Sequence, residues 1–266
     1  MIKLDIAISP VTEALKEKIE ELRKEFLRLY TQKDEMLSIE RDDLYIRYID
    51  VIGRDKYENF CLSIEVRALK MKCELAQAAI NRNEHPDISF INRQVDKQLE
   101  DYYRQVAEQA EAIKAAEEAK TISSFDLEEM QQLFRLLVKR LHPDLHPDQS
   151  EAMKDLFIQG QTAYRTHNMQ LLREIIMRLD LNEGIDEFVS KSQESLEQII
   201  ERLETQIAEI KSDINTLLTT FPFNIRKQIM DPAWVHQEQE ELKRERRELE
   251  ELKETYTKRL QLLIEM

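Results

Sequence analysis

The chain has 266 residues, which is enough for one or two domains with a sizeable core. Its formal net charge is −14 and its basic residues are mostly interleaved with acidic ones. This argues against DNA or RNA as the principal partner, because phosphate binding needs a coherent positive surface. Three glycines, six prolines and 35% charged residues are typical of long helices and coiled coils, and too few turn residues are present for a β-sheet protein.

The expected location is the cytoplasm. No apolar run approaches the ~20 residues needed to cross a bilayer, and the first six residues are too few and too charged for a secretion signal. Cys61 and Cys73 have no metal-ligand spacing, and we expect them to pack as small apolar groups in a reducing compartment. These patterns predict no membrane association.

Residues 1–120 are predicted to form an N-terminal helical region. Residues 2–8 alternate apolar and polar side chains, which favours a short extended segment. Ser9-Pro10 is a favourable helix start, from which a helix should reach Ile52 and end near Gly53. Two more helices are expected over residues 56–83 and 88–120. The first helix carries a coiled-coil-like seam of Leu15, Ile19, Leu22, Phe26, Leu29 and Met36.

The most informative stretch is an apolar and basic helix that stops at a His-Pro-Asp tripeptide, His142-Pro143-Asp144. Pro143 cannot continue a helix, so the helix should end at Leu141 or His142 and hold Asp144 on a turn as a solvent-facing carboxylate. The remaining helix surface carries positive charge from Arg135, Lys139 and Arg140. The apolar residues follow the spacing of one buried helix face: Leu133, Phe134, Leu137, Val138 and Leu141.

The flanks of this tripeptide resemble the J-domain of DnaJ-type co-chaperones over residues 121–180. Asp126 and Glu129 have the spacing of a capping box at the start of the basic helix, and J-domains begin that helix with a similar acidic cap. In J-domains the helix after the loop carries a Phe and then an Ala-Tyr pair. Phe157 and Ala163-Tyr164 have that spacing here. They share a predicted helix face with Ser150, Met153 and Gly160.

The resemblance implies a co-chaperone that docks on a DnaK-type chaperone and stimulates its ATPase. Asp144 would engage the chaperone, His142 and Pro143 would fix the loop, and the three basic residues would meet an acidic patch on the partner. No chemistry occurs in a J-domain, so we expect neither an enzyme nor a cofactor. For the tripeptide itself, the alternative is a helix-ending turn in an unrelated bundle. For the whole chain, the alternative function is a coiled-coil scaffold or interaction protein whose degenerate J-like module has no coupling to a chaperone.

The other His-Pro-Asp tripeptides lack these flanks. His85-Pro86-Asp87 follows a segment without a basic face and is predicted to be a helix end, a turn and a new helix start. His146-Pro147-Asp148 lies inside the loop. J-domains open with a short Asp-Tyr-Tyr-type helix, but Asp101-Tyr102-Tyr103 is too far upstream, so the helix over 88–120 is expected to replace it. Residues 169–179 match the family's last helix only loosely.

A metal site at the tripeptide is not expected. The candidate ligands are His142, His146 and His167 with Asp144 and Asp148. Pro143 and Pro147 exclude the helix that would align the first two histidines, and no third ligand has motif spacing.

Residues 181–266 are predicted to form an antiparallel coiled-coil hairpin that binds a partner or an unidentified client. Its first helix has the cleanest heptad seam in the chain, and its second begins at Asp231-Pro232. A coiled coil of this kind can also join two copies of the chain. Aromatic residues collect at the hairpin tip, where they either close its end or contact a client: Phe221, Phe223 and Trp234. The overall expectation is an all-α protein of long helices and antiparallel hairpins around a J-domain-like module.

Overall fold

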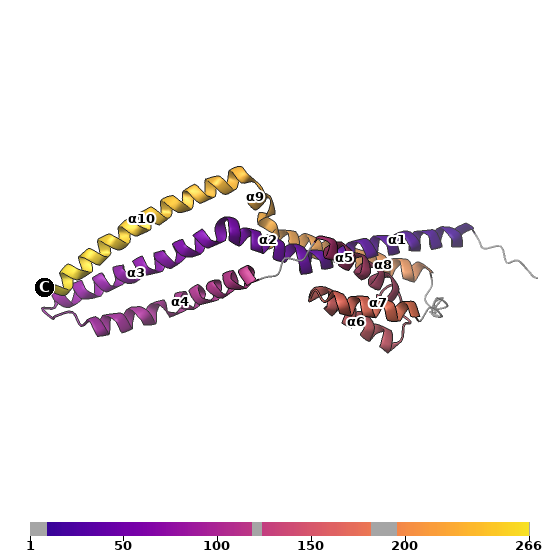
Figure 1. The fold of residues 1–266 in the computed structure, drawn as a ribbon, viewed down its shortest axis with the longest axis horizontal. Helices are drawn as coiled ribbons and strands as arrows, with labels where there is room; N and C mark the ends of the chain where they lie inside the picture. Colours follow the sequence, from indigo (N-terminus) through magenta and orange to yellow (C-terminus); the bar gives the residue numbers. More distant parts are fainter. Residues whose placement is uncertain (1–9, 119–123, 182–195, 266) are drawn as a thin grey trace, which may run out of the picture. The chain divides into compact units, whose positions relative to one another are not determined.

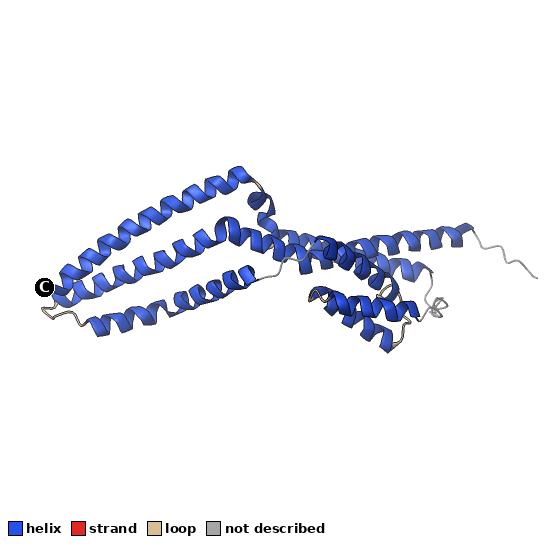
Figure 2. Cartoon of the chain, viewed as in Figure 1, coloured by secondary structure: helices blue, strands red, loops and turns tan. Residues whose placement is uncertain are grey.

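The computed structural model describes residues 10–118, 124–181 and 196–265, and these are helical with short loops between them (Figure 2). An all-α fold is therefore confirmed, and no strand occurs within the described ranges. The alternating segment over residues 2–8 lies outside them. The longer helices are α1 (Pro10–Glu35), α3 (Arg54–Asn81), α4 (Ile88–Glu118), α5 (Ser124–Leu141), α6 (Glu151–Arg165), α7 (Met169–Leu181), α8 (Leu196–Thr219) and α10 (Pro232–Glu265).

The helix predicted to end near Gly53 continues through it. Gly53 has helical backbone angles (φ −64°, ψ −36°) and leads directly into α3. Between α1 and α3 the chain stays helical through two π-helical turns and one short α-helix. These elements are η1 (Met36–Glu40), α2 (Arg41–Tyr48) and η2 (Ile49–Gly53). A single glycine lowers helix stability by only about 1 kcal/mol relative to alanine, which packing can offset.

The chain forms two compact units, and each is assembled from separate parts of the sequence. The first unit combines residues 1–42 with 121–224, and the second combines residues 43–120 with 225–266. The predicted division into 1–120, 121–180 and 181–266 is therefore wrong. A division into consecutive domains requires helices that are neighbours in sequence to pair. In the structure, the apolar faces of helices far apart in sequence pair instead.

In the second unit, α3 packs between α4 and α10 (Figure 1). The predicted helices over 56–83 and 88–120 correspond to α3 and α4. These two lie antiparallel, as the pairs Arg54–Glu117 and Arg67–Tyr102 indicate. The core of the three helices includes Ile64, Cys73, Ala76, Ile91, Val95, Leu99 and Leu263.

Helix α10 runs parallel to α3 and is not paired with α8. Lys56 contacts Glu238 and Lys253 contacts Glu65, so residue numbers rise together along the two helices. Buried Asn59 donates to the Leu242 carbonyl oxygen (2.9 Å) and fixes the register. The predicted antiparallel hairpin over 181–266 is therefore not formed, because each of its helices pairs with a helix of the N-terminal region.

In the first unit, α8 runs parallel to α1. Three ion pairs rise in the same order along both helices: Lys18–Glu204, Lys211–Glu25 and Lys33–Asp213. The buried face of α8 is the predicted seam, with Ile200, Leu203, Ile207, Ile210 and Ile214 all nearly inaccessible. Within the same unit, α1 also packs against α5.

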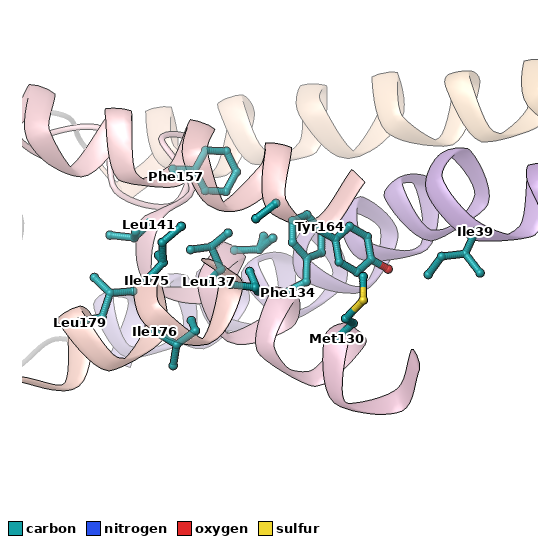
Figure 3. Packing of buried hydrophobic residues seen from close by; sticks show 13 residues of the cluster. Ile39, Met130, Phe134, Leu137, Leu141, Phe157, Tyr164, Ile175, Ile176 and Leu179 are labelled. Carbon is teal, nitrogen blue, oxygen red and sulfur yellow. The ribbon is translucent and has the colours of Figure 1, made fainter. Parts of the chain in front are cut away.

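The segment predicted to resemble a J-domain forms a compact cluster of α5, α6 and α7 (Figure 3). Phe134 and Tyr164 stack face to face with their ring centroids 4.0 Å apart, as Figure 3 shows. The other buried members include Met130, Leu137, Val138, Leu141, Phe157, Ala163, Leu172, Ile175 and Ile176. The apolar face predicted from Phe134 to Leu141, and the spacing of Phe157 and Ala163-Tyr164, thus describe real packing.

Two local predictions around this cluster are wrong. Helix α5 begins at Ser124, so Asp126 lies in its first turn and Glu129 instead pairs with Arg173 of α7. The helix over 88–120 does not replace the first J-domain helix, because its apolar face is used against α3. Helix α1 packs on the cluster instead, through Leu27 and Tyr30, together with nearby Ile39 of η1.

Candidate functional site

The His142-Pro143-Asp144 loop begins where α5 ends, at Leu141. The amide nitrogens of Leu145 and His146 donate to the His142 carbonyl oxygen at 3.0 and 2.9 Å. The Asp144 amide nitrogen donates to Nδ1 of His142 at 3.1 Å. Because Nδ1 accepts this hydrogen bond, the neutral imidazole carries its proton on Nε2. The ring thus fixes the backbone of the residue that would meet a partner.

The imidazole of His142 is buried among three aromatic rings. Phe26 and Tyr30 of α1 and Phe157 of α6 contact it edge-on, with centroid distances of 4.9, 4.3 and 5.0 Å. The side chain keeps only 7% of its accessible surface. His142 therefore has a structural role in holding the loop, in keeping with the role that the resemblance implies for it.

Asp144 does not face solvent freely, which corrects the expectation from the sequence. Its carbonyl oxygen accepts a 2.6 Å hydrogen bond from Nη1 of Arg202 on α8. Its carboxyl group hydrogen-bonds the Gln206 side chain, one turn further along α8. Burial raises the pKa of Asp144 and Glu209 raises it further, while Arg202 and Gln206 lower it. The side chain retains 39% exposure, so more than half of its surface is covered.

The three basic residues of α5 lie at the surface. Arg135 and Lys139 are exposed and Arg140 is half-buried. Arg135 lies close enough to α1 to act on Glu35, whose pKa is raised by burial and by Glu40 and lowered by Arg135. Lys139 and Arg140 stand in the last turn of α5, next to the loop.

The other two tripeptides have different roles. Asp87 caps α4, since its Oδ1 accepts from the Phe90 amide nitrogen at 3.0 Å, and His85 is exposed. This confirms the predicted helix end, turn and new start. Nε2 of His146 lies 2.8 Å from the Lys139 carbonyl oxygen at the end of α5, so His146 helps to close the loop.

The aromatic residues predicted at the hairpin tip differ in exposure. Phe223 is buried (5% exposed), which removes it as a client contact, because its ring is used in packing. Phe221 is 47% exposed and Trp234 is half-buried. Phe221 and Trp234 belong to different units.

Sequence reasoning missed the residues that cover the loop. The spacing of Phe26 predicts only a position in a coiled-coil seam, and Tyr30, Arg202 and Gln206 belong to no motif. Within the described ranges, no group of three or more His, Cys, Asp or Glu side chains could hold a metal ion. None of the described helices is both long enough and apolar enough to cross a membrane.

Comparisons with protein-family models, curated proteins and solved structures returned no match for this chain.

Burial of His142 predicts that acid destabilises the first unit. Burial, and to a lesser extent the neighbouring His146, lower the pKa of His142 to about 3. An unfolded histidine titrates near ~6.5, so the unfolded chain binds a proton that the folded chain excludes. The stabilisation is complete above pH ~6.5 and is lost as the pH falls from there toward about 3. At pH 5 we expect a loss of roughly 2 kcal/mol, measured by denaturant unfolding at pH 5 and 7.5.

A variant comparison isolates this contribution from the carboxyl groups. Asp34 and Asp144 have raised pKa values and shift stability in the opposite direction, so the wild-type profile alone is ambiguous. His142→Gln should unfold more easily at pH 7.5 but lose little further stability at pH 5. His85→Gln, at an exposed position, should keep the wild-type slope. An unchanged slope in His142→Gln would contradict the assignment.

Proposed function

We propose that this protein is a J-domain-like co-chaperone that docks on a DnaK-type chaperone and stimulates its ATPase. The observation that carries the proposal is the loop at the end of α5. There, buried His142 holds the Asp144 backbone through its Nδ1 atom, next to a positively charged helix end. A helix-ending turn without a partner would not require a buried imidazole to position a half-exposed aspartate.

The packing around the loop supports the same function. Helices α5 and α6 are joined by the loop and held together through Phe134, Phe157 and Tyr164, so the loop is presented by a rigid scaffold. Rigid elements position binding residues more precisely than isolated loops do. The free thiols of Cys61 and Cys73 are compatible with a reducing compartment, and we place the protein in the cytoplasm on this ground.

The alternative function is a helical scaffold whose J-like module has lost its coupling to a chaperone. The extensive α3–α10 pairing in the second unit favours this alternative, because none of its contacts involves the loop. A single measurement separates the two functions. Purified protein should accelerate steady-state ATP hydrolysis by a DnaK-type chaperone from the same organism, whereas a scaffold leaves the rate unchanged.

The basic end of α5 gives a second test. Lys139→Glu together with Arg140→Glu should weaken binding to the chaperone by roughly tenfold, or about 1.4 kcal/mol. Wild-type binding should also weaken between 50 and 300 mM salt, because surface charges are screened over ~8–10 Å at physiological ionic strength. Binding is measured by titration of labelled chaperone.

A matched control separates local charge from net charge. Lys70→Glu together with Lys258→Glu changes the net charge equally at exposed positions of the second unit. This variant should bind as the wild type does. Equal weakening by both double variants would indicate a general charge effect and remove α5 as the docking surface.

Phe221 remains as the exposed candidate for client contact.

A further inference from the structure

Helix α8 holds the residue that a chaperone would have to contact. Nη1 of Arg202 donates to the Asp144 carbonyl oxygen at 2.6 Å, and the Gln206 side chain hydrogen-bonds the Asp144 carboxyl group. Arg202 and Gln206 are four residues apart and therefore share one face of α8. The contact thus engages both the backbone and the side chain of Asp144.

The α1–α8 pair places this face over the loop. Leu203 and Ile207, next to Arg202 and Gln206, are buried in the seam with α1. Ion pairs at Lys18–Glu204 (2.7 Å) and Lys211–Glu25 (2.7 Å) flank the same stretch of α8. Phe26 and Tyr30 of α1 contact the ring of His142 in the same loop. The loop is therefore held by both helices of the pair.

The contact between α8 and Asp144 has a cost in free energy. Gln206 Oε1 is buried and has no hydrogen-bond partner among the described residues. A buried acceptor without a partner costs about 1–3 kcal/mol. Burial also raises the pKa of Asp144, with Glu209 adding to the effect, so the ionised carboxylate is less favourable here than in water. Release of the loop would return the Asp144 carboxyl group to water and remove its desolvation cost.

Binding in cis and binding of a chaperone exclude each other at Asp144. The hydrogen-bonding positions of Asp144 that Arg202 and Gln206 fill cannot bind a second protein at the same time. A chaperone would bind only the fraction of molecules whose loop is released, and its apparent affinity falls in proportion to that fraction. Any change that strengthens the α8 contact therefore lowers chaperone binding.

We propose that α8 masks the His142-Pro143-Asp144 loop through Arg202 and Gln206, and that their release from Asp144 makes the loop available to a DnaK-type chaperone. This inference rests on the co-chaperone function proposed above. It assigns to the long α1–α8 pair a regulatory role at the docking site of the same unit.

The release variant combines Arg202→Ala with Gln206→Ala in the full chain. Both side chains are half-buried at the edge of the seam, so the α1–α8 core should remain intact. We expect half-maximal ATPase stimulation at a several-fold lower concentration than for the wild type. Thr205→Ala is the matched control, because it truncates an exposed side chain between the two positions. The Thr205 hydroxyl group donates to the Glu201 carbonyl oxygen of its own helix. This variant should behave as the wild type.

A second readout does not involve the chaperone. Amide hydrogen exchange over residues 142–149 should accelerate in the release variant, because the Asp144 backbone loses its bond to Arg202. Unchanged exchange would overturn the inference. Wild-type stimulation by a release variant whose loop does exchange faster would overturn it as well, while leaving the proposed function standing. If neither the wild type nor the release variant stimulates the ATPase, the proposed function fails and the inference falls with it.

Discussion

Asp144→Asn is expected to reduce stimulation of a DnaK-type ATPase to the rate of the chaperone alone. The substitution removes the negative charge that the resemblance assigns to the chaperone contact and keeps the size of the side chain. Its effect on folding should be small, within about 0.5 kcal/mol. The Asp144 carbonyl and amide groups keep their bonds to Arg202 and His142, and an asparagine oxygen can still accept from Gln206.

Asp87→Asn is the matched control, because Asp87 closes another His-Pro-Asp tripeptide. Asparagine caps a helix as well as aspartate does, so α4 should keep its start at Ile88. This variant should stimulate the ATPase like the wild type. The assay should be repeated in the Arg202→Ala, Gln206→Ala background, where the loop is expected to be released. Full stimulation by Asp144→Asn in that background would rule out the proposed role of the carboxylate.

Sequence periodicity predicted which face of each helix is buried. In α5, the apolar spacing predicts the positions of Phe134, Leu137 and Leu141 against α6 and α7. Pro143 sets the end of α5, and Asp231-Pro232 sets the start of α10, where Asp231 accepts from the Ala233 amide nitrogen. These features are local, because they depend on side-chain spacing and backbone restrictions within one or two turns.

The partner of each helix could not be predicted in the same way. The seam of α8 is compatible with any apolar stripe of similar length, and charge pairs at its edges select among them. In the structure those charges are Lys18, Glu25 and Lys33 of α1, more than 170 residues away in sequence. A short connection would have favoured an antiparallel hairpin with α10. The parallel pairing with α1 needs the long connection that the intervening helices supply.

The contact of α8 with the loop could not be predicted from the sequence for a related reason. Arg202 and Gln206 border the apolar seam of α8, where polar residues are usual and carry no distinctive pattern. Their contact with Asp144 exists only because α1 brings α8 to the J-domain-like cluster. The candidate site residues on α5 could be named from their sequence flanks, whereas the residues proposed to regulate access to the loop depend on tertiary pairing.

The α1–α8 pair also determines the largest expected effect on stability. Ile207 is 4% exposed at the centre of the seam, between Leu203 and Ile210. Ile207→Asp would place a carboxylate in this desolvated contact with no planned partner. An uncompensated buried charge costs about 3–5 kcal/mol, which is comparable to the whole stability of many domains. The flanking ion pairs are at least half-exposed on one side and cannot offset this loss.

We therefore expect Ile207→Asp to separate α8 from α1, with loss of hydrogen-exchange protection over residues 196–219. Ala208→Asp, which places the same charge at the adjacent exposed position, should leave that protection intact. The cluster of α5, α6 and α7 contains no residue of α8, so residues 130–179 should stay protected in both variants. Simultaneous loss of protection in α8 and in this cluster would show that they fold as one cooperative unit. In that case α8 could not leave the His142-Pro143-Asp144 loop without unfolding the helices that present it.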